Sequence, residues 1–114
     1  SDADLREGWR RHMDALRAFS RRTDRTIVFT EVGYNRSEIA AKEPWNDHTD
    51  HGESARRLQA RCLKVALDAI DAEPSVVGSF LWTWFPEPHP NGRTFALATD
   101  ETKALICERW CRKR

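Results

Sequence analysis

The chain has 114 residues, 39% of them hydrophobic, and a formal net charge of +1, a composition that fits one ordinary globular domain. Its basic residues are dispersed except for an arginine-rich stretch over residues 10–25, which fits the exposed face and end of a helix, so nucleic-acid binding is not expected. No apolar stretch approaches the roughly 20 residues of a membrane span, and the three cysteines are expected to be buried or partly buried free thiols that leave the cellular compartment open.

The first predicted element is an amphipathic helix over about residues 3–20. Its apolar side chains recur at helical spacing, at Leu5, Trp9, Met13, Leu16 and Phe19. The polar residues 21–25 then form a short turn, and residues 26–30 predict a strand that is buried on both faces in a parallel sheet.

A long loop over residues 32–52 precedes the second predicted helix. Asp50 and Glu53 resemble a capping box at the start of this helix, which ends before Pro74. Its inner stripe consists of Leu58, Cys62, Val65, Ala66 and Ile70.

The last part of the chain predicts a second buried strand and a third helix. β-branched and aromatic residues mark the strand over residues 76–84. A strand–helix–strand unit of this kind predicts a right-handed crossover and two parallel strands. A Pro-rich loop over residues 86–92 leads to a helix that begins at a Thr99 or Asp100 cap and ends at Trp110.

The connections are asymmetric, because those that follow strands are long and those that follow helices are short. This asymmetry is typical of α/β barrels with a site at one end. A complete (β/α)8 TIM barrel needs roughly 200 residues or more. We therefore expect residues 1–114 to be the C-terminal fragment, about the last quarter, of one barrel domain, in the order helix-strand-helix-strand-helix. The chain begins without methionine, and its expected partner is the missing N-terminal part of the barrel.

Glu31 follows the first predicted strand, at the point where a carboxylate can leave the buried sheet for the loops above it. Barrel enzymes carry their catalytic groups at this end of the strands. The structural alternative is a solvated or salt-bridged glutamate, since strand ends commonly carry a charge.

Three motifs in this order resemble the last two strand-and-loop units of clan A glycoside hydrolases, most closely the family 113 mannanases. They are Phe29-Thr30-Glu31-Val32-Gly33-Tyr34, Glu43-Pro44-Trp45-Asn46 and Gly78-Ser79-Phe80-Leu81-Trp82-Thr83-Trp84. The resemblance implies that Glu31 is the nucleophile and that Trp82 and Trp84 line a sugar subsite. It also implies an acid/base glutamate on the fourth strand of the barrel, a part that this chain does not contain.

Retaining glycoside hydrolysis uses two carboxyl groups about 5 to 5.5 Å apart, one attacking the anomeric carbon and the other protonating the leaving oxygen. Glu31 must stay ionised to attack, so it needs hydrogen-bond donors. Tyr34 and Asn35 are candidate donors and substrate-binding residues. Their structural alternative is a turn after the strand, with Gly33 allowing the bend.

Three tryptophans are candidates for contact with a carbohydrate substrate. Trp82 and Trp84 alternate with Thr83, which in a strand turns both indoles to the same side. A flat indole near a strand end stacks on the apolar face of a pyranose ring, although ordinary core packing also uses aromatics. Trp45 lies in the long loop, where it is either the wall of a subsite or an anchor for the loop.

Two histidines and two aspartates crowd one stretch of the long loop, residues 47–51. Their spacing is not specific for a metal, and Asp50 has a competing role as a helix cap. No metal and no cofactor is expected, and substrate contact by His48 or Asp47 is the favoured interpretation.

The sequence therefore predicts the C-terminal part of a retaining glycoside hydrolase acting on mannan-like β-linked polysaccharides or oligosaccharides. The isolated chain is expected to be inactive, because half of the catalytic pair lies outside it. One alternative is a non-catalytic barrel remnant that serves as a carbohydrate-binding or phage-tail component. Another is a small α/β interaction module that depends on a partner.

Overall fold

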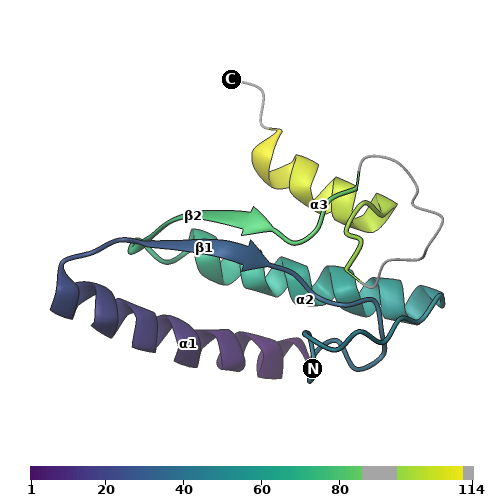
Figure 1. Ribbon diagram of the computed structural model, residues 1–114, viewed down its shortest axis with the longest axis horizontal. Helices are drawn as coiled ribbons and strands as arrows, with labels where there is room; N and C mark the ends of the chain where they lie inside the picture. Colours follow the sequence, from purple (N-terminus) through teal and green to yellow (C-terminus); the bar gives the residue numbers. More distant parts are fainter. Residues whose placement is uncertain (86–94, 112–114) are drawn as a thin grey trace.

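The computed structural model describes residues 1–85 and 95–111. Its helices and strands follow in the predicted order (Figure 1): α1 Asp2–Thr23, β1 Ile27–Val32, α2 Glu53–Asp71, β2 Val76–Leu81 and α3 Asp100–Trp110. The Pro-rich loop predicted over residues 86–92 lies entirely outside the described residues.

Helix α1 is capped at its start by the side chain of Ser1 and at its end by the backbone amide of Asp24. The hydroxyl of Ser1 accepts a hydrogen bond from the amide of Asp4, which satisfies one of the free N–H groups at the start of the helix. The helix ends at Thr23, three residues later than predicted, because Asp24 adopts a left-handed conformation with φ of 53°. Aspartate tolerates that conformation better than most residues do.

Strands β1 and β2 form a two-stranded parallel sheet, joined by α2 as the sequence predicts. Their register is not uniform. Between the pairs Ile27–Val76 and Val28–Gly78, β1 advances one residue while β2 advances two. Between Phe29–Ser79 and Val32–Leu81, β1 advances three residues while β2 advances two. The second irregularity is a β-bulge that places one extra residue in β1 between Phe29 and Val32.

Both strands end elsewhere than the sequence predicted. The predicted strand ends at Thr30, with Glu31 just beyond it. In the structure β1 runs to Val32, so Glu31 lies inside the strand. Strand β2 ends at Leu81, three residues before Trp84, and the chain then turns.

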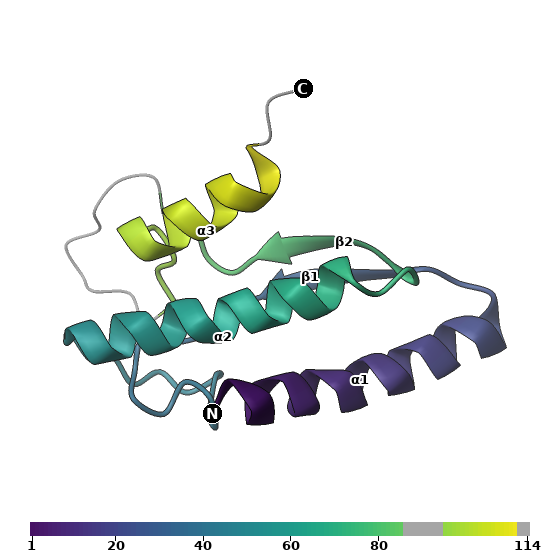
Figure 2. The same ribbon diagram turned by 180° about the vertical axis from the view of Figure 1, so that it is seen from behind.

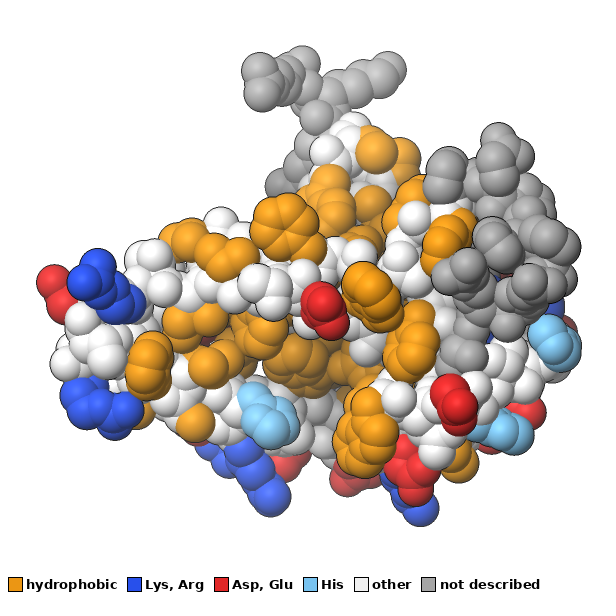
Figure 3. All heavy atoms as spheres, in the orientation of Figure 1, with side chains coloured by type: hydrophobic (Ala, Val, Ile, Leu, Met, Phe, Trp, Pro, Cys, Tyr) orange, Lys and Arg blue, Asp and Glu red, His pale blue; other side chains and the backbone are white. Residues whose placement is uncertain are grey.

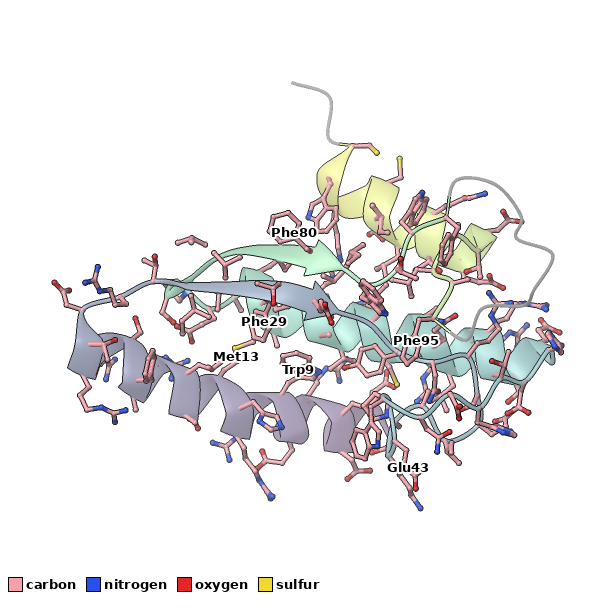
Figure 4. The ribbon with its side chains drawn as sticks, viewed as in Figure 1. Trp9, Met13, Phe29, Glu43, Phe80 and Phe95 are labelled. Atoms are coloured by element: carbon pink, nitrogen blue, oxygen red, sulfur yellow. The ribbon has the colours of Figure 1, made fainter. Side chains whose placement is uncertain are left out.

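The helices form a layer against one face of the sheet. Figure 2 shows α2 running along the strands, in front of β1, with α1 beside it. Figure 4 shows Trp9 and Met13 directed from α1 toward the sheet while Phe29 points from β1 toward α1. Leu63, Leu67 and the other inward residues of α2 are fully buried in this core. Each such leucine stabilises the fold by about 1.5–3 kcal/mol relative to an exposed one.

The second face of the sheet is open in this chain. Val28 of β1 and Val77 and Phe80 of β2 are exposed, and Figure 3 shows hydrophobic side chains gathered across the strands and along the gap between them and α1. The prediction that both faces are buried therefore holds for only one face within the described residues. An exposed apolar face of this kind is unusual for a free-standing domain.

The structure confirms the Thr99 cap predicted for α3 and contradicts the capping box predicted for α2. Thr99 caps α3, because its hydroxyl accepts a hydrogen bond from the amide of Thr102. Gly52, and not Asp50, occupies the cap position of α2. The Asp50 carboxylate instead accepts the amide of Glu38 at 3.0 Å and contacts His48 at 3.2 Å. It therefore closes the long loop on itself.

The cysteines divide into one buried and two exposed thiols. Cys62 is buried in the core, as expected, and burial raises the pKa of its thiol to about 11. Cys107 and Cys111 are exposed, which differs from the prediction, because this end of α3 projects beyond the core (Figure 1).

A buried carboxylate ties α1 to the connection between α2 and β2. Glu73 is 3% exposed, and its Oε2 accepts a hydrogen bond of 2.6 Å from Nη2 of Arg17. Its other oxygen accepts bonds from the backbone and hydroxyl of Ser75. The bond from Arg17, with those from Ser75, lowers the pKa of Glu73 from 4.5 to about 2.

Candidate functional site

The candidate site is built where the C-terminal ends of β1 and β2 meet. The amide of Trp82 donates a 2.8 Å hydrogen bond to the carbonyl of Val32, which continues the sheet one residue past β2. Gly33 follows at the same level and lies directly against the Trp82 backbone. A Cβ on Gly33 would stand 1.8 Å from the Trp82 carbonyl oxygen, so no larger residue fits without movement. Glu31 and Trp82 are therefore held on adjacent strand ends.

The β-bulge determines which way Glu31 faces. Phe29 and Val32 both contribute to the core, whereas strict alternation would put them on opposite faces. The extra residue of β1 between them takes up this difference, and Glu31 is exposed. Among the residues that the structure describes, none donates a hydrogen bond to its carboxylate. Glu31 is therefore accessible to a ligand from the open side.

Tyr34 lies in the core and not beside the Glu31 carboxylate. Its hydroxyl accepts a 3.0 Å hydrogen bond from the indole N–H of Trp9 on α1, and its carbonyl accepts one of 2.8 Å from the amide of Gln59 on α2. Burial raises the pKa of the Tyr34 hydroxyl to about 12. These contacts give Tyr34 a role in joining the two helices to the end of β1.

Asn35 is fully buried and holds the long loop together. Its amide nitrogen donates to the carbonyls of Glu43 at 2.7 Å and Asn46 at 2.8 Å. Its oxygen accepts the hydroxyl of Ser37 at 2.7 Å. All side-chain groups of Asn35 are engaged, so Asn35, like Tyr34, supports the loop and the end of β1 from inside the fold.

Trp82 and Trp84 are both partly exposed, at 48% and 40%. Because β2 ends at Leu81, the alternation expected for a strand does not set their directions. Thr83 between them is instead fixed by two backbone hydrogen bonds of 3.1 Å, to the carbonyl of Phe95 and from the amide of Leu97. The two tryptophans thus stand on either side of Thr83, whose amide and carbonyl are both hydrogen-bonded.

Trp45 is the most exposed of the three predicted tryptophans, at 74%. It stands in the long loop at the rim of a groove of about 600 Å3 between α1 and that loop. Trp9, Phe29 and Tyr34 form the apolar floor of the groove, and Lys42 adds a charge at its rim. Glu43, from the same motif, lies on the outside of the loop (Figure 4) and accepts a hydrogen bond from Asn46. The structure thus places Trp45 over this groove.

In the crowded stretch over residues 47–51, His48 contacts the carboxylate of Asp50. Residues 1–85 and 95–111 contain no group of three or more potential ligands that could hold a metal ion. In the same part of the chain, no helix is both long and apolar enough to cross a membrane.

Sequence reasoning missed Arg36 and Gln59, two polar residues close behind the site. Arg36 follows Asn35 in the loop, and Gln59 is a buried polar residue on the inner face of α2. Gln59 directly follows Leu58 of the predicted apolar stripe. A polar residue next to that stripe is the one signal of its role that the sequence offers. What the sequence could not show is the carbonyl that both residues reach, at Ala96.

Comparison with known proteins gives a family. The family model for Glycoside Hydrolase Family 113 matches residues 2–100 of the chain. No curated protein and no solved structure matches the chain.

Proposed function

The chain belongs to glycoside hydrolase family 113, and on that premise we propose that it supplies the nucleophile half of a retaining glycoside hydrolase active site. The substrate class is a mannan-like β-linked polysaccharide or oligosaccharide. One observation carries the proposal, namely the exposed carboxylate of Glu31 on the strand end that is hydrogen-bonded to Trp82.

The chemistry assigned to Glu31 is attack on the anomeric carbon of the sugar. Its carboxylate forms a covalent bond to that carbon while the glycosidic oxygen leaves and takes a proton from a second carboxylic acid. Water then hydrolyses the glycosyl-enzyme, with the second residue acting as base. The second carboxyl group stands about 5–5.5 Å away in retaining enzymes and is assigned to the part of the barrel that precedes this chain.

Trp82 is proposed as the platform on which the sugar ring rests. Its half-exposed indole combines a flat apolar face with an N–H donor, the pair of properties that a pyranose ring requires. Trp84 is the second platform residue. Trp45 is proposed as an outer wall, because it is exposed on the loop that follows β1.

Two features support completion of the site by further barrel strands. The open sheet face carries Val28, Val77 and Phe80, all exposed here although apolar. The sheet has only two strands among the described residues, so each has one edge without a neighbour. Preceding strand–helix units would cover the face, pair with the edges and fill the groove between α1 and the long loop.

The test uses the complete protein, meaning this chain together with the preceding barrel strands. Glu31→Gln keeps the size of the side chain and removes the nucleophile, so hydrolysis of mannan oligosaccharides should fall by about 1000-fold or more while binding persists. Glu108→Gln, an exposed glutamate on α3, is the matched control and should keep normal turnover. Normal turnover in the Glu31→Gln protein would overturn the assignment.

A covalent trap gives a second, independent measurement. A fluorinated mannoside that slows release of the glycosyl-enzyme should label the complete protein once, and peptide mass analysis should find the label on Glu31. A label on another carboxylate would move the nucleophile elsewhere.

A second candidate function is carbohydrate binding without cleavage. The exposed tryptophans favour it, because stacking on Trp82, Trp84 and Trp45 requires no catalytic acid. Calorimetric titration with mannan oligosaccharides separates the two functions. Binding by the complete wild-type protein with no release of reducing sugar would replace the hydrolase proposal with this one.

A further inference from the structure

Two polar side chains from different elements meet at a single backbone carbonyl, that of Ala96. Arg36, in the loop after β1, donates from Nη2 at 3.1 Å. Gln59, on α2, donates from Nε2 at 3.4 Å and also reaches the carbonyl of Tyr34 at 2.8 Å. Arg36 is partly buried and Gln59 almost completely so. Together they hold the short segment around Ala96 against the loop after β1 and against α2.

The residues on either side of Ala96 hold the backbone between the two site tryptophans. The Thr83 amide donates to the carbonyl of Phe95, and the Leu97 amide donates to the carbonyl of Thr83, each at 3.1 Å. Figure 4 shows Phe95 beyond the strand ends, near α2. The Ala96 carbonyl is used by neither bond and is taken up by Arg36 and Gln59. A continuous set of contacts therefore runs from Arg36 to Thr83.

We propose that Arg36 and Gln59 are positioning residues for the carbohydrate platform, acting through Ala96 and Thr83 on Trp82 and Trp84. This inference rests on the proposed function for its consequence, since it concerns how the same site holds a sugar. Neither residue is assigned a contact with substrate. Their effect is to fix the angle at which the two indoles are presented.

Substitution of Arg36 distinguishes a positioning role from a general effect on stability better than substitution of Gln59 does. Leu97 is fully buried in the core and anchors the same segment by packing, so removal of one polar contact should leave the segment in place but less constrained. Gln59 also binds Tyr34, so its removal disturbs the core as well. Within the described residues, the only hydrogen bond that the Arg36 side chain makes is to Ala96.

The experiment compares three variants of the complete protein. Arg36→Met removes the donor and keeps most of the aliphatic stem, whereas Arg36→Lys keeps a charged donor that can still reach the Ala96 carbonyl. Arg57→Met is the matched control, because Arg57 is an exposed arginine on α2 that pairs with Glu53. Circular dichroism and urea unfolding establish that each variant is folded before the other measurements are made.

The first readout does not require catalysis. Fluorotryptophan is incorporated, and the fluorine NMR signals of Trp82, Trp84 and Trp110 are assigned by single Trp→Phe substitutions. Arg36→Met should shift or broaden the signals of Trp82 and Trp84 and leave that of Trp110 unchanged. Arg36→Lys should restore them, and Arg57→Met should resemble the wild type. Unchanged Trp82 and Trp84 signals in a folded Arg36→Met protein would overturn the proposal.

The second readout is kinetic. A misplaced platform weakens binding of substrate and transition state alike, so KM for mannan oligosaccharides should rise about threefold to tenfold with kcat nearly unchanged. A fall in kcat at constant KM would contradict positioning of a platform. If the protein proves to bind sugar without cleaving it, the hydrolase assignment fails while the NMR result and the dissociation constant still decide the role of Arg36.

Discussion

Gly33 touches the backbone of Trp82 so closely that a methyl group on Gly33 would stand 1.8 Å from the Trp82 carbonyl oxygen. The contact joins the end of β1 to the end of β2 just beyond their last ladder pair. It sets the separation between the strand that carries Glu31 and the segment that carries both platform tryptophans. The dimensions of the candidate site therefore depend on the absence of a side chain at Gly33.

Gly33→Ala should damage both stability and binding. The strands must separate or the Trp82 peptide must move, and such overpacking costs about 1–3 kcal/mol. Gly78→Ala is the control, because a Cβ at Gly78 meets nothing within 4 Å. Urea unfolding of both variants checks the prediction. Equal stability of the two would show that the close contact relaxes freely.

Trp82→Ala should weaken binding of mannan oligosaccharides by about tenfold, because the variant loses a stacked aromatic surface worth roughly 1–2 kcal/mol. Trp110→Ala removes an indole of similar exposure from α3, at 49% against 48%, and should leave the affinity unchanged. Titration calorimetry on the complete protein measures both. A comparable loss in the Trp110 variant would mean that the sugar rests elsewhere.

Asn35→Ala should open the long loop without removing any proposed site residue. The variant loses the buried Asn35 amide that donates to the carbonyls of Glu43 and Asn46, and we expect the free energy of unfolding to fall by about 2 kcal/mol or more. Cleavage of residues 33–52 by a protease should become faster. Asn46→Ala removes only side-chain contacts that are exposed to solvent, so it should change the free energy of unfolding by about 0.5 kcal/mol. Wild-type resistance to the protease in Asn35→Ala would contradict this role.

Glu73 predicts a specific acid sensitivity. Its pKa is lowered from 4.5 to about 2 in the folded protein, first by the hydrogen bond from Arg17. A lowered pKa stabilises the fold above pH 4.5, and that contribution disappears as the pH falls from 4.5 to about 2.

The measurement compares wild type with Glu73→Gln by urea unfolding across this pH range. The variant should be less stable at pH 7, and the difference should shrink steadily toward pH 2. Glu108→Gln, on the exposed side of α3, should follow the wild-type curve. A difference between wild type and Glu73→Gln that stays constant with pH would show that packing, and not charge, accounts for the loss.

The sequence predicts the fold well where the signal is local. The first two helices follow from apolar spacing and the third from its cap, and Thr99 is recognised because a cap needs only the next three residues. Asp50 has the same chemistry, but its carboxylate is drawn to Glu38, twelve residues earlier in the chain. The competing partner is brought there by the loop fold, which residue spacing does not encode.

The candidate site is predicted only in outline for the same reason. The position of Glu31 near a strand end follows from the apolar run before it. Its exposure does not, because strict alternation would put it on the same side as Phe29, facing the helices. Tyr34 and Asn35 look like site residues in the sequence, since polar groups after a strand serve either a loop or a ligand. Their burial is settled by partners as distant as Trp9 and Asn46.

The extra residue in β1 has a consequence for how this sequence can vary. Substitutions between Phe29 and Val32 change one side chain at a time, but deletion of a single residue there would remove the bulge and restore regular alternation. Phe29 and Val32 would then stand two positions apart, so alternation alone would keep both on the helix side and the residue between them on the open side. Over these positions the strand should therefore tolerate the loss of Thr30, which leaves Glu31 on the open side, but the loss of Glu31 itself would remove the carboxylate from the site.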